Sequence, residues 1–338
     1  MSELRRWNGP QAFDAALLRE MDDDDGVIVM GTEVVQSALR RFGPQRSRAV
    51  PIAENGVSGL AVGAAMAGLR PVVILRNATF SYLAFDQLLN QAAKMRYMSG
   101  GQARVSAVFC VSFYSAGQAM AAQHSQPSYA LYAHVPGVRV VAPANPADAY
   151  GLLRAAIRSD DPVIFVESAW LAEDVAEVDP EHLVEIGTAA IARGGTDVTI
   201  AAAAHAVPVA LDAAAALARD GIAAEVIDLR TIAPLDTATI RASVRKTGRL
   251  VVVDESPPVC SLAAEIVADV TTDPVTFAAL RAQPARVCAA PVPVPFSPPL
   301  EAAVFPSAGD VARAARGLVA GSLAGATSGW GSSPGRAR

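Results

Sequence analysis

Two side chains in the first half of the chain are suited to acid–base chemistry. Glu54 follows the apolar run Ala49 to Ala53 and precedes a helical pattern, with no further acid before Asp86. An apolar setting favours the protonated form of a carboxyl group, but the helix dipole alone also favours a glutamate in a first turn. His124 lies in the run Ala121 to Gln126. An imidazole can bind a carboxylate or transfer a proton, although a lone histidine is more often structural.

Length and composition exclude several classes of protein. The 338 residues allow two domains with full cores. The hydrophobic share is 52%, and the net charge of −5 gives no basic surface for nucleic acid. The most apolar stretch, Thr199 to Ala218, is interrupted by His205 and Asp212, so no membrane span is expected. The segment Met1 to Trp7 shows no secretory signal.

The cysteines do not suggest disulfide bonds or metal binding. Cys110, Cys260 and Cys288 are far apart, and they form no Cys-x-x-Cys pair. We therefore expect neither a disulfide framework nor a zinc site, but small side chains in hydrophobic surroundings. This usage fits a reducing cytoplasm.

Short apolar runs alternate with helical patterns along the first half. Pro71 to Leu75 predicts a buried strand, and Pro146 to Arg158 predicts a helix with Asn145 as its N-cap. The other elements expected in this half are the strands Gly26 to Met30, Val105 to Cys110, Val138 to Ala142 and Pro162 to Val166 and the helices Gly56 to Leu69 and Ala84 to Tyr97. Apolar strands alternating with helices are typical of an α/β fold, a mostly parallel sheet with helices on both faces.

The second half repeats this alternation as a separate α/β unit. A helix over Thr237 to Lys246 is expected between the N-cap Asp236 and the stop signal Gly248. We therefore expect two domains, residues 1–172 and 195–320, joined by an acidic linker at 173–194. Residues 321–338 are rich in Gly, Ser and Ala, and we expect a disordered tail there.

Several motifs occur in the order and spacing of one protein family. They are Pro51 to Gly56, Phe85 to Lys94, Arg96 to Gly101, Ala121 to Gln126, Ala224 to Asp236 and Lys246 to Glu255. From about Trp7 to Leu318 the chain resembles the beta subunit of the thiamine-diphosphate-dependent decarboxylating component of 2-oxo acid dehydrogenases, of the pyruvate, branched-chain or acetoin type. The resemblance implies a transketolase-like pyrimidine-binding domain followed by a transketolase carboxyl-terminal domain.

The resemblance also implies roles for individual residues. In the family, a glutamic acid hydrogen-bonded to the far ring nitrogen of the aminopyrimidine drives the cofactor amine into its imino form. The imino group then takes the thiazolium proton. Glu54 matches that acid, Phe80 matches the aromatic residue that stacks on the aminopyrimidine, and Ile52 matches a position lining the same pocket. His124 matches the histidine that holds the substrate carboxylate or passes a proton to the carbonyl adduct. Arg76 lies near the cofactor in this match, where it is a candidate for an anionic substrate group or a solvent-facing arginine.

A structural potassium ion is a further implication of the resemblance. Many family members bind it through positions that match the backbone carbonyls of Ala107, Ala156, Ile157 and Ser159, together with Asp161. Ser159 departs from the acidic or amide residue that is usual in the family.

One motif that the cofactor requires is absent from the sequence. Enzymes of this type hold the diphosphate through Mg²⁺ with a Gly-Asp-Gly run, which does not occur here. The resemblance implies that an alpha subunit supplies this site in an α2β2 heterotetramer. Gly56, Gly59 and Gly63 share one face of the predicted helix, where each glycine costs about 1 kcal/mol. We expect close approach of another backbone there, or else tight packing within one domain.

The sequence departs from the family around the substrate. Cys110 to Ser115 replaces an Arg-x-Pro-x-Gly run, Leu83 stands where glutamine is common, and Ser256 to Cys260 replaces a glycine-rich turn. The leading hypothesis is a beta subunit that decarboxylates a 2-oxo acid and passes the acyl or enamine unit to a lipoyl group on an acyltransferase. Transfer to an aldehyde or ketone, as in an acyloin synthase or split transketolase, is the second. A non-catalytic assembly subunit is the third.

Overall fold

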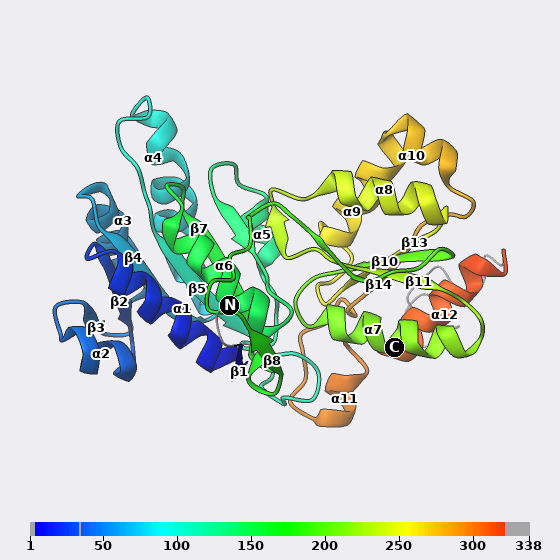
Figure 1. Ribbon diagram of the computed structural model, residues 1–338, viewed down its shortest axis with the longest axis horizontal. Coiled ribbons are helices and arrows are strands. Elements are labelled where there is room, and N and C mark those ends of the chain that lie inside the picture. Colours follow the sequence, from blue (N-terminus) through cyan, green and yellow to red (C-terminus); the bar gives the residue numbers. More distant parts are fainter. Residues whose placement is uncertain (1–3, 34, 322–338) are drawn as a thin grey trace, which may run out of the picture. The chain divides into compact units, whose positions relative to one another are not determined.

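The described chain divides into two units, each built around its own main sheet. The computed structural model describes residues 4–33 and 35–321 (Figure 1). The first unit holds the described residues of 1–115, 123–188 and 230–235, and the second holds those of 116–122, 189–229 and 236–338. Each unit is therefore built from segments that are separated in sequence.

The first unit is built on a mostly parallel sheet. Its described strands are β2 (Val27–Gly31), β3 (Ser47–Ala49), β4 (Arg70–Asn77), β5 (Val108–Phe113), β6 (Arg139–Val141), β7 (Val163–Ser168) and β12 (Thr231–Ala233). Their order is β12-β6-β7-β5-β4-β2-β3, and β12 is antiparallel to its neighbour β6. The five strands predicted in this half are confirmed, with ends shifted by up to three residues. A parallel sheet brings the carboxyl ends of its strands to one edge.

Helices cover both faces of this sheet. The helices of the unit are α1 (Gly9–Asp23), α2 (Gln36–Phe42), α3 (Glu54–Met66), α4 (Ala93–Met98), α5 (Tyr129–Ala133) and α6 (Pro146–Arg158). On one face, Leu17 of α1 and Leu153 of α6 pack into a core with Phe165 of β7. On the other face α3 packs along β4. A two-stranded sheet of β1 (Arg5–Asn8) and β8 (Val175–Val178) completes the unit.

The prediction of one regular α-helix over Ala84 to Tyr97 is wrong. The chain there forms a 3₁₀ turn at Phe80–Ala84, a π-helix at Asp86–Ala92 and only then α4. The side chain of Gln87 lies against Gly59 of α3, where an added Cβ would come within 3.0 Å of Gln87 Oε1. Packing against α3 thus accompanies the wider turns, which the apolar period of the sequence does not reveal.

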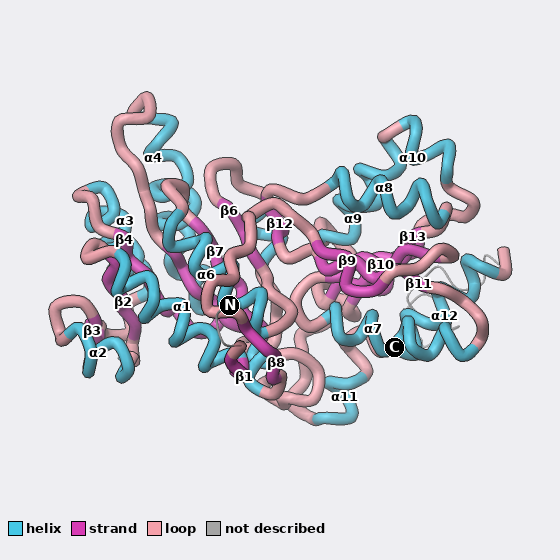
Figure 2. Tube along the Cα trace, viewed as in Figure 1, coloured by secondary structure: helices cyan, strands magenta, loops and turns pink. Residues whose placement is uncertain are grey.

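The second unit is a smaller α/β sheet (Figure 2). Its described strands are β9 (Ala190–Arg193), β10 (Val198–Ala202), β11 (Ala224–Asp228), β13 (Leu250–Asp254) and β14 (Ala285–Cys288), in the order β14-β13-β10-β11-β9. Its helices are α7 (Ala206–Arg219), α8 (Thr237–Thr247), α9 (Leu262–Thr272), α10 (Pro274–Ala279), α11 (Pro298–Ala302) and α12 (Ala308–Val319). Only β9 among these strands pairs antiparallel. The predicted α/β fold class is confirmed in both units.

Helix ends follow the capping residues closely. Asn145 accepts a hydrogen bond from the Asp148 backbone at the start of α6, and Asp236 accepts one from the Thr239 backbone at the start of α8. Gly248 ends α8 with φ of 72°, a left-handed conformation that costs glycine little.

The segment expected as a linker carries secondary structure. Residues 173–194 contain β8, which belongs to the first unit, and β9, which belongs to the second. In the structure, this segment of the first unit ends at Thr188, and the second unit resumes at Ala189. The expected tail at 321–338 lies outside the described residues except for Gly321. None of the described helices combines the length and the apolar character that a membrane crossing needs.

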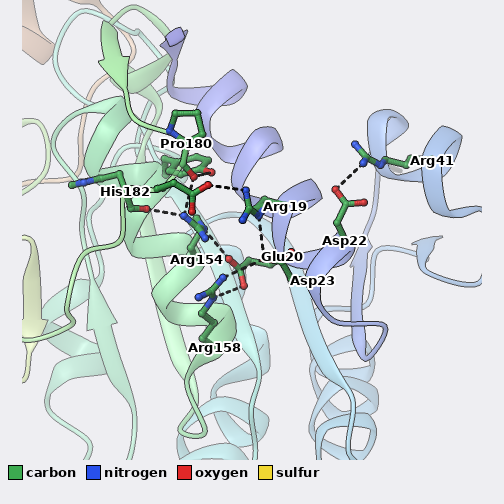
Figure 3. Close-up of polar contacts among 11 residues, drawn as sticks. Arg19, Glu20, Asp22, Asp23, Arg41, Arg154, Arg158, Pro180 and His182 are labelled. Atoms are coloured by element: carbon green, nitrogen blue, oxygen red, sulfur yellow. Dashed lines mark hydrogen bonds and ion pairs between the residues drawn. The ribbon is translucent and has the colours of Figure 1, made fainter. Parts of the chain in front are cut away.

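A buried ion pair fastens α6 to α1 (Figure 3). The Glu20 carboxylate accepts hydrogen bonds from Arg154 Nε at 2.8 Å and from Arg158 Nε at 2.7 Å. Arg154 also donates to the backbone carbonyls of Pro180 and His182. Glu20 and Arg154 are both almost fully buried, so either charge would be costly without the other.

We predict that Glu20→Gln lowers the free energy of unfolding by roughly 3–5 kcal/mol, because it leaves the Arg154 guanidinium buried without a counter-charge. The matched control is Asp22→Asn, which removes the exposed pair with Arg41 and is expected to cost less than about 1 kcal/mol. Urea unfolding followed by circular dichroism measures both. Equal losses in the two variants would contradict the role of the buried pair.

Candidate active site

Three of the predicted site residues follow successive strands of the first unit. Glu54 comes after β3, Phe80 after β4 and His124 after β5. The rings of Phe80 and His124 are in edge-to-face contact, with centroids 5.2 Å apart and planes at 70°. The structure therefore brings together an aromatic face and an imidazole from segments 44 positions apart in sequence.

The position of His124 is fixed by backbone contacts. Its carbonyl accepts a hydrogen bond from the Tyr114 backbone N–H at 3.0 Å. The Thr79 hydroxyl, next to Phe80, donates to the carbonyl of Gln123. The Tyr114 ring lies edge-to-face against the His124 ring, at 6.4 Å between centroids. His124 thus lies in a turn between two aromatic rings and not in a helix, since α5 begins only at Tyr129.

The loop before His124 is held in the second unit by a buried carboxylate. Glu301 is fully buried, and its two oxygens accept hydrogen bonds from the backbone N–H groups of Gly117, at 2.8 Å, and Ala119, at 3.0 and 3.2 Å. Ala119 and Ala121 have φ of 52° and 62°, which is unfavourable for alanine. Glu301 therefore stabilises a strained loop conformation that ends directly before Gln123 and His124.

Glu54 has an acid group that is available to a ligand. It is the first residue of α3 and half-buried. Within the described residues its carboxylate has no hydrogen-bond or ion-pair partner. The neighbouring Ile52 is 82% exposed. An unpaired acid beside an exposed aliphatic side chain is the arrangement expected of a surface that another molecule covers.

Two of the three glycines of α3, Gly56 and Gly63, face away from the unit, whereas Gly59 lies against Gln87. An added Cβ at Gly63 would meet nothing within 4 Å, and one at Gly56 would meet only Ala53, at 3.9 Å. Leu60 and Met66 of the same helix are 56% and 46% exposed. Packing inside the described part of the first unit does not account for these two glycines. The alternative expectation, close approach of the backbone of another chain, would explain them.

Arg76 lies in a different setting from Phe80 and His124. Its guanidinium forms an ion pair with Glu33, which follows β2. Both residues line a cavity of about 430 Å³ in the first unit. None of Ile52, Glu54, Phe80 and His124 lines this cavity. A place for Arg76 beside the cofactor stays a prediction.

Two ionisable groups inside this cavity are perturbed by burial. Burial raises the pKa of the Glu167 carboxyl to about 7, although the Arg76 guanidinium acts to lower it. Burial, together with the Glu167 charge, raises the pKa of the Cys110 thiol well above its usual value. Glu167 can therefore be neutral near neutral pH, whereas Cys110 is an unreactive thiol.

The carbonyls predicted to hold potassium already have partners. Arg70 Nη1 donates to the carbonyls of Ile157, at 3.1 Å, and Ser159, at 2.9 Å. The carbonyls of Ala107 and Ala156 accept backbone N–H groups, and the Asp161 carboxylate pairs with Arg96 and Arg139. As these side chains stand, the site does not fit a potassium ion, because the ion would have to displace the Arg70 guanidinium.

Sequence reasoning missed Glu33, Tyr114, Glu167 and Glu301. Glu167 is the last residue but one of the apolar strand β7, so a signal for a buried acid was present. Glu301 lies in a proline-rich segment and Glu33 lies after a short strand, and neither has a local pattern that marks its contacts. Among the described residues, no cluster of three or more His, Cys, Asp or Glu side chains could hold a metal ion.

Comparisons with known proteins agree with the two-domain reading. Residues 8–172 match the transketolase pyrimidine binding domain, and residues 187–311 match the transketolase C-terminal domain. The chain is 44% identical over 320 residues to the mitochondrial pyruvate dehydrogenase E1 component subunit beta-2 of Oryza sativa, covering 90% of this chain and 84% of that one.

Two bacterial relatives are similarly close. The pyruvate dehydrogenase E1 component subunit beta of Rickettsia felis is 45% identical, covering 90% of this chain and 96% of its own. The acetoin:2,6-dichlorophenolindophenol oxidoreductase subunit beta of Cupriavidus necator is 42% identical, covering 92% and 96%. A solved split-gene transketolase, an inactive beta4 tetramer, aligns with a TM-score of 0.76 at 23% identity, over 95% of this chain and 99% of that one, and supports the fold.

We predict that Glu167→Gln changes how stability depends on pH. A carboxyl whose pKa is about 7 when folded and about 4.5 when unfolded binds its proton more tightly in the native state. Its contribution to stability is therefore lost as the pH rises from about 4.5 to 7, by about 3 kcal/mol in all. The glutamine variant should be the more stable protein at pH 8, and this excess should vanish at pH 4.5. Urea unfolding measures the stability of both proteins, and the exposed Glu173→Gln is the control. A stability difference between Glu167→Gln and the wild type that does not change with pH would contradict the raised pKa of Glu167.

We predict that Arg70→Met makes the thermal stability of the chain depend on potassium. The substitution removes two hydrogen bonds to the carbonyls of Ile157 and Ser159 and the ion pairs with Asp24 and Asp160, and it should cost roughly 1–3 kcal/mol. Replacing sodium by potassium should raise the Tm of this variant but not that of the wild type, measured by circular dichroism. Arg104→Met, which removes an exposed pair with Asp160, is the control. A Tm of the wild type that rises with potassium would show that an ion binds despite Arg70.

Proposed function

The chain belongs to the family of pyruvate dehydrogenase E1 beta subunits, and we propose that it is the beta subunit of a heteromeric, thiamine-diphosphate-dependent enzyme that decarboxylates a 2-oxo acid. The observation that carries this proposal is the contact of Phe80 with His124 at the sheet edge where Glu54 also lies. Thiamine diphosphate, when bound there, would supply the nucleophilic carbon that attacks the 2-oxo group and the electron sink for loss of CO₂.

The residues at this edge fit the aminopyrimidine part of the cofactor. The Glu54 carboxyl has no partner within the described residues, so it is available to hold a proton at a ring nitrogen. The half-buried Phe80 ring offers an aromatic face, and the exposed Ile52 offers an aliphatic wall. We propose that these three residues hold the aminopyrimidine and that Glu54 sets its tautomer.

His124 is the group we propose for the substrate. Its imidazole lies beside Phe80 and is held through backbone contacts to Tyr114. A histidine so placed can bind the substrate carboxylate in its charged form, or move a proton at the carbonyl oxygen. Glu54 and His124 thus receive different tasks, the first at the cofactor ring and the second at the reacting group.

A partner chain completes the site in this proposal. The sequence has no Gly-Asp-Gly run to hold Mg²⁺ and a diphosphate, which we assign to an alpha subunit in an α2β2 heterotetramer. The outward-facing Gly56 and Gly63, with the exposed Leu60 and Met66, support α3 as the surface that this subunit covers. Because α3 begins at Glu54, docking there would enclose the acid in the same step.

The acceptor of the two-carbon or acyl unit has two candidates in this proposal. A lipoyl group on an acyltransferase is the first candidate, as the resemblance to beta subunits of 2-oxo acid dehydrogenases implies. An aldehyde or ketone acceptor is the second, favoured by the replacement of the usual Arg-x-Pro-x-Gly run by Cys110 to Ser115. Acyl-lipoamide and a new carbon–carbon bond are the products that separate them. A cytoplasmic location stays a prediction.

We predict that Glu54→Ala lowers 2-oxo acid decarboxylation by the reconstituted assembly by roughly 10²–10⁴-fold, the range for loss of a general acid–base group. Lipoamide and acetaldehyde are supplied in parallel, and the products are identified by mass spectrometry. The exposed Glu173→Ala is the control and should keep full activity. Equal activity of the Glu54→Ala assembly and the wild type would favour the non-catalytic assembly subunit.

A further inference from the structure

The cavity beside Arg76 lies where α/β sheets commonly bind ligands. After β2 the chain moves to β3 on one side, and then it crosses to β4 on the other side of β2. The connections therefore change direction between β2 and β4, and ligands bind preferentially outside the carboxyl ends of strands at such a switch point. Glu33 after β2 and Arg76 at the end of β4 both line the cavity there.

Part of the cavity wall is apolar, although the acid Glu167 also lines it. Phe13 of α1, Ile74 of β4 and Val111 of β5 line it, and Phe13 and Val111 are buried. A volume of about 430 Å³ falls within the range of small-molecule pockets. This apolar part of the wall therefore suits the aliphatic part of a ligand.

Two arginines line the same cavity from its exposed side. Arg40 of α2 is exposed and has no ion-pair partner within the described residues. Arg76 has a side chain that is 58% exposed, and its partner Glu33 is 72% exposed. An exposed ion pair of this kind contributes little free energy. A carboxylate that enters the cavity can therefore replace Glu33 as the partner of Arg76.

The backbone at Arg76 is strained. Its φ is 60°, and the pairing of β4 with β5 shifts register between Ile74 and Arg76. A left-handed conformation is uncommon for arginine, and such strain is found most often at functional sites. The strand irregularity turns the side chain of Arg76 toward Glu33 at the cavity.

We propose that this cavity binds a short-chain aliphatic monocarboxylate, whose carboxylate meets Arg76 and Arg40 and whose tail packs against Phe13, Ile74 and Val111. This site goes beyond the proposed function, since it needs neither the cofactor nor a partner chain. Tyr114 lines the cavity and contacts the His124 ring, so the two sites share one wall.

Two other acids line the cavity and must tolerate the ligand. Asp14 accepts a hydrogen bond from the Ser37 hydroxyl at 3.0 Å. Glu167 has its pKa raised to about 7 by burial, so a large share of it is neutral at pH 7. In that form it is a hydrogen-bond donor and not a repelling charge.

The test is calorimetric titration of the full-length chain at pH 7 with pentanoate, and with pentan-1-ol and pentylamine as neutral and cationic ligands of similar shape. Saturable binding of pentanoate is expected, with at least tenfold weaker binding of the other two. Arg76→Gly should weaken pentanoate binding at least tenfold. This variant is not expected to unfold, because glycine adopts a φ of 60° without strain. Arg76→Lys should keep binding within about threefold, because it keeps the charge.

Arg104→Gln, an exposed arginine that does not line the cavity, is the matched control and should bind as the wild type does. Absence of saturable pentanoate binding, equal binding of pentan-1-ol, or unchanged binding by a folded Arg76→Gly variant would each overturn the proposal. Since no cofactor or alpha subunit is present, none of these results bears on the decarboxylation proposed above.

Discussion

The parallel pairing of β2, β3, β4, β5 and β7 is the constraint on which both candidate sites of the first unit depend. Parallel strands end at one edge of the sheet, so residues that follow separate strands meet there. Phe80 and His124 come into ring contact in this way. Glu33 and Arg76 meet at the same edge for the same reason. Without parallel pairing, these side chains would have no common edge at which to gather.

The helix α3 carries both the proposed catalytic acid and the proposed contact surface for the alpha subunit. Its first residue is the acid Glu54, and its outward face carries Gly56 and Gly63 with open space beyond them. Glycine at an exposed helix position weakens the helix by about 1 kcal/mol, and the described part of the first unit gains no packing in return. The proposed heterotetramer accounts for both features, because one partner surface would use the glycines and enclose the acid.

The sequence predicts those parts of the fold that local patterns determine. Asn145, Asp236 and Gly248 mark helix ends because capping is decided within three or four residues. The turns over Asp86–Ala92 could not be predicted, since they accompany the packing of Gln87 on Gly59. In the candidate site, motif order predicts roles for Glu54, Phe80 and His124, and the structure brings the rings of Phe80 and His124 into contact. The pairing of Arg76 with Glu33 depends on strand order and a left-handed residue, which no local pattern displays.

We propose that this chain holds one half of a thiamine diphosphate site. Calorimetric titration of thiamine diphosphate with Mg²⁺ into this chain alone, and then into the chain co-purified with its alpha subunit, tests that claim most directly. The proposed division predicts saturable binding only in the mixture, because the chain lacks the Gly-Asp-Gly run that would hold the diphosphate. Tight binding by this chain alone would contradict a shared site. Absence of binding in the mixture would contradict the assignment of the cofactor.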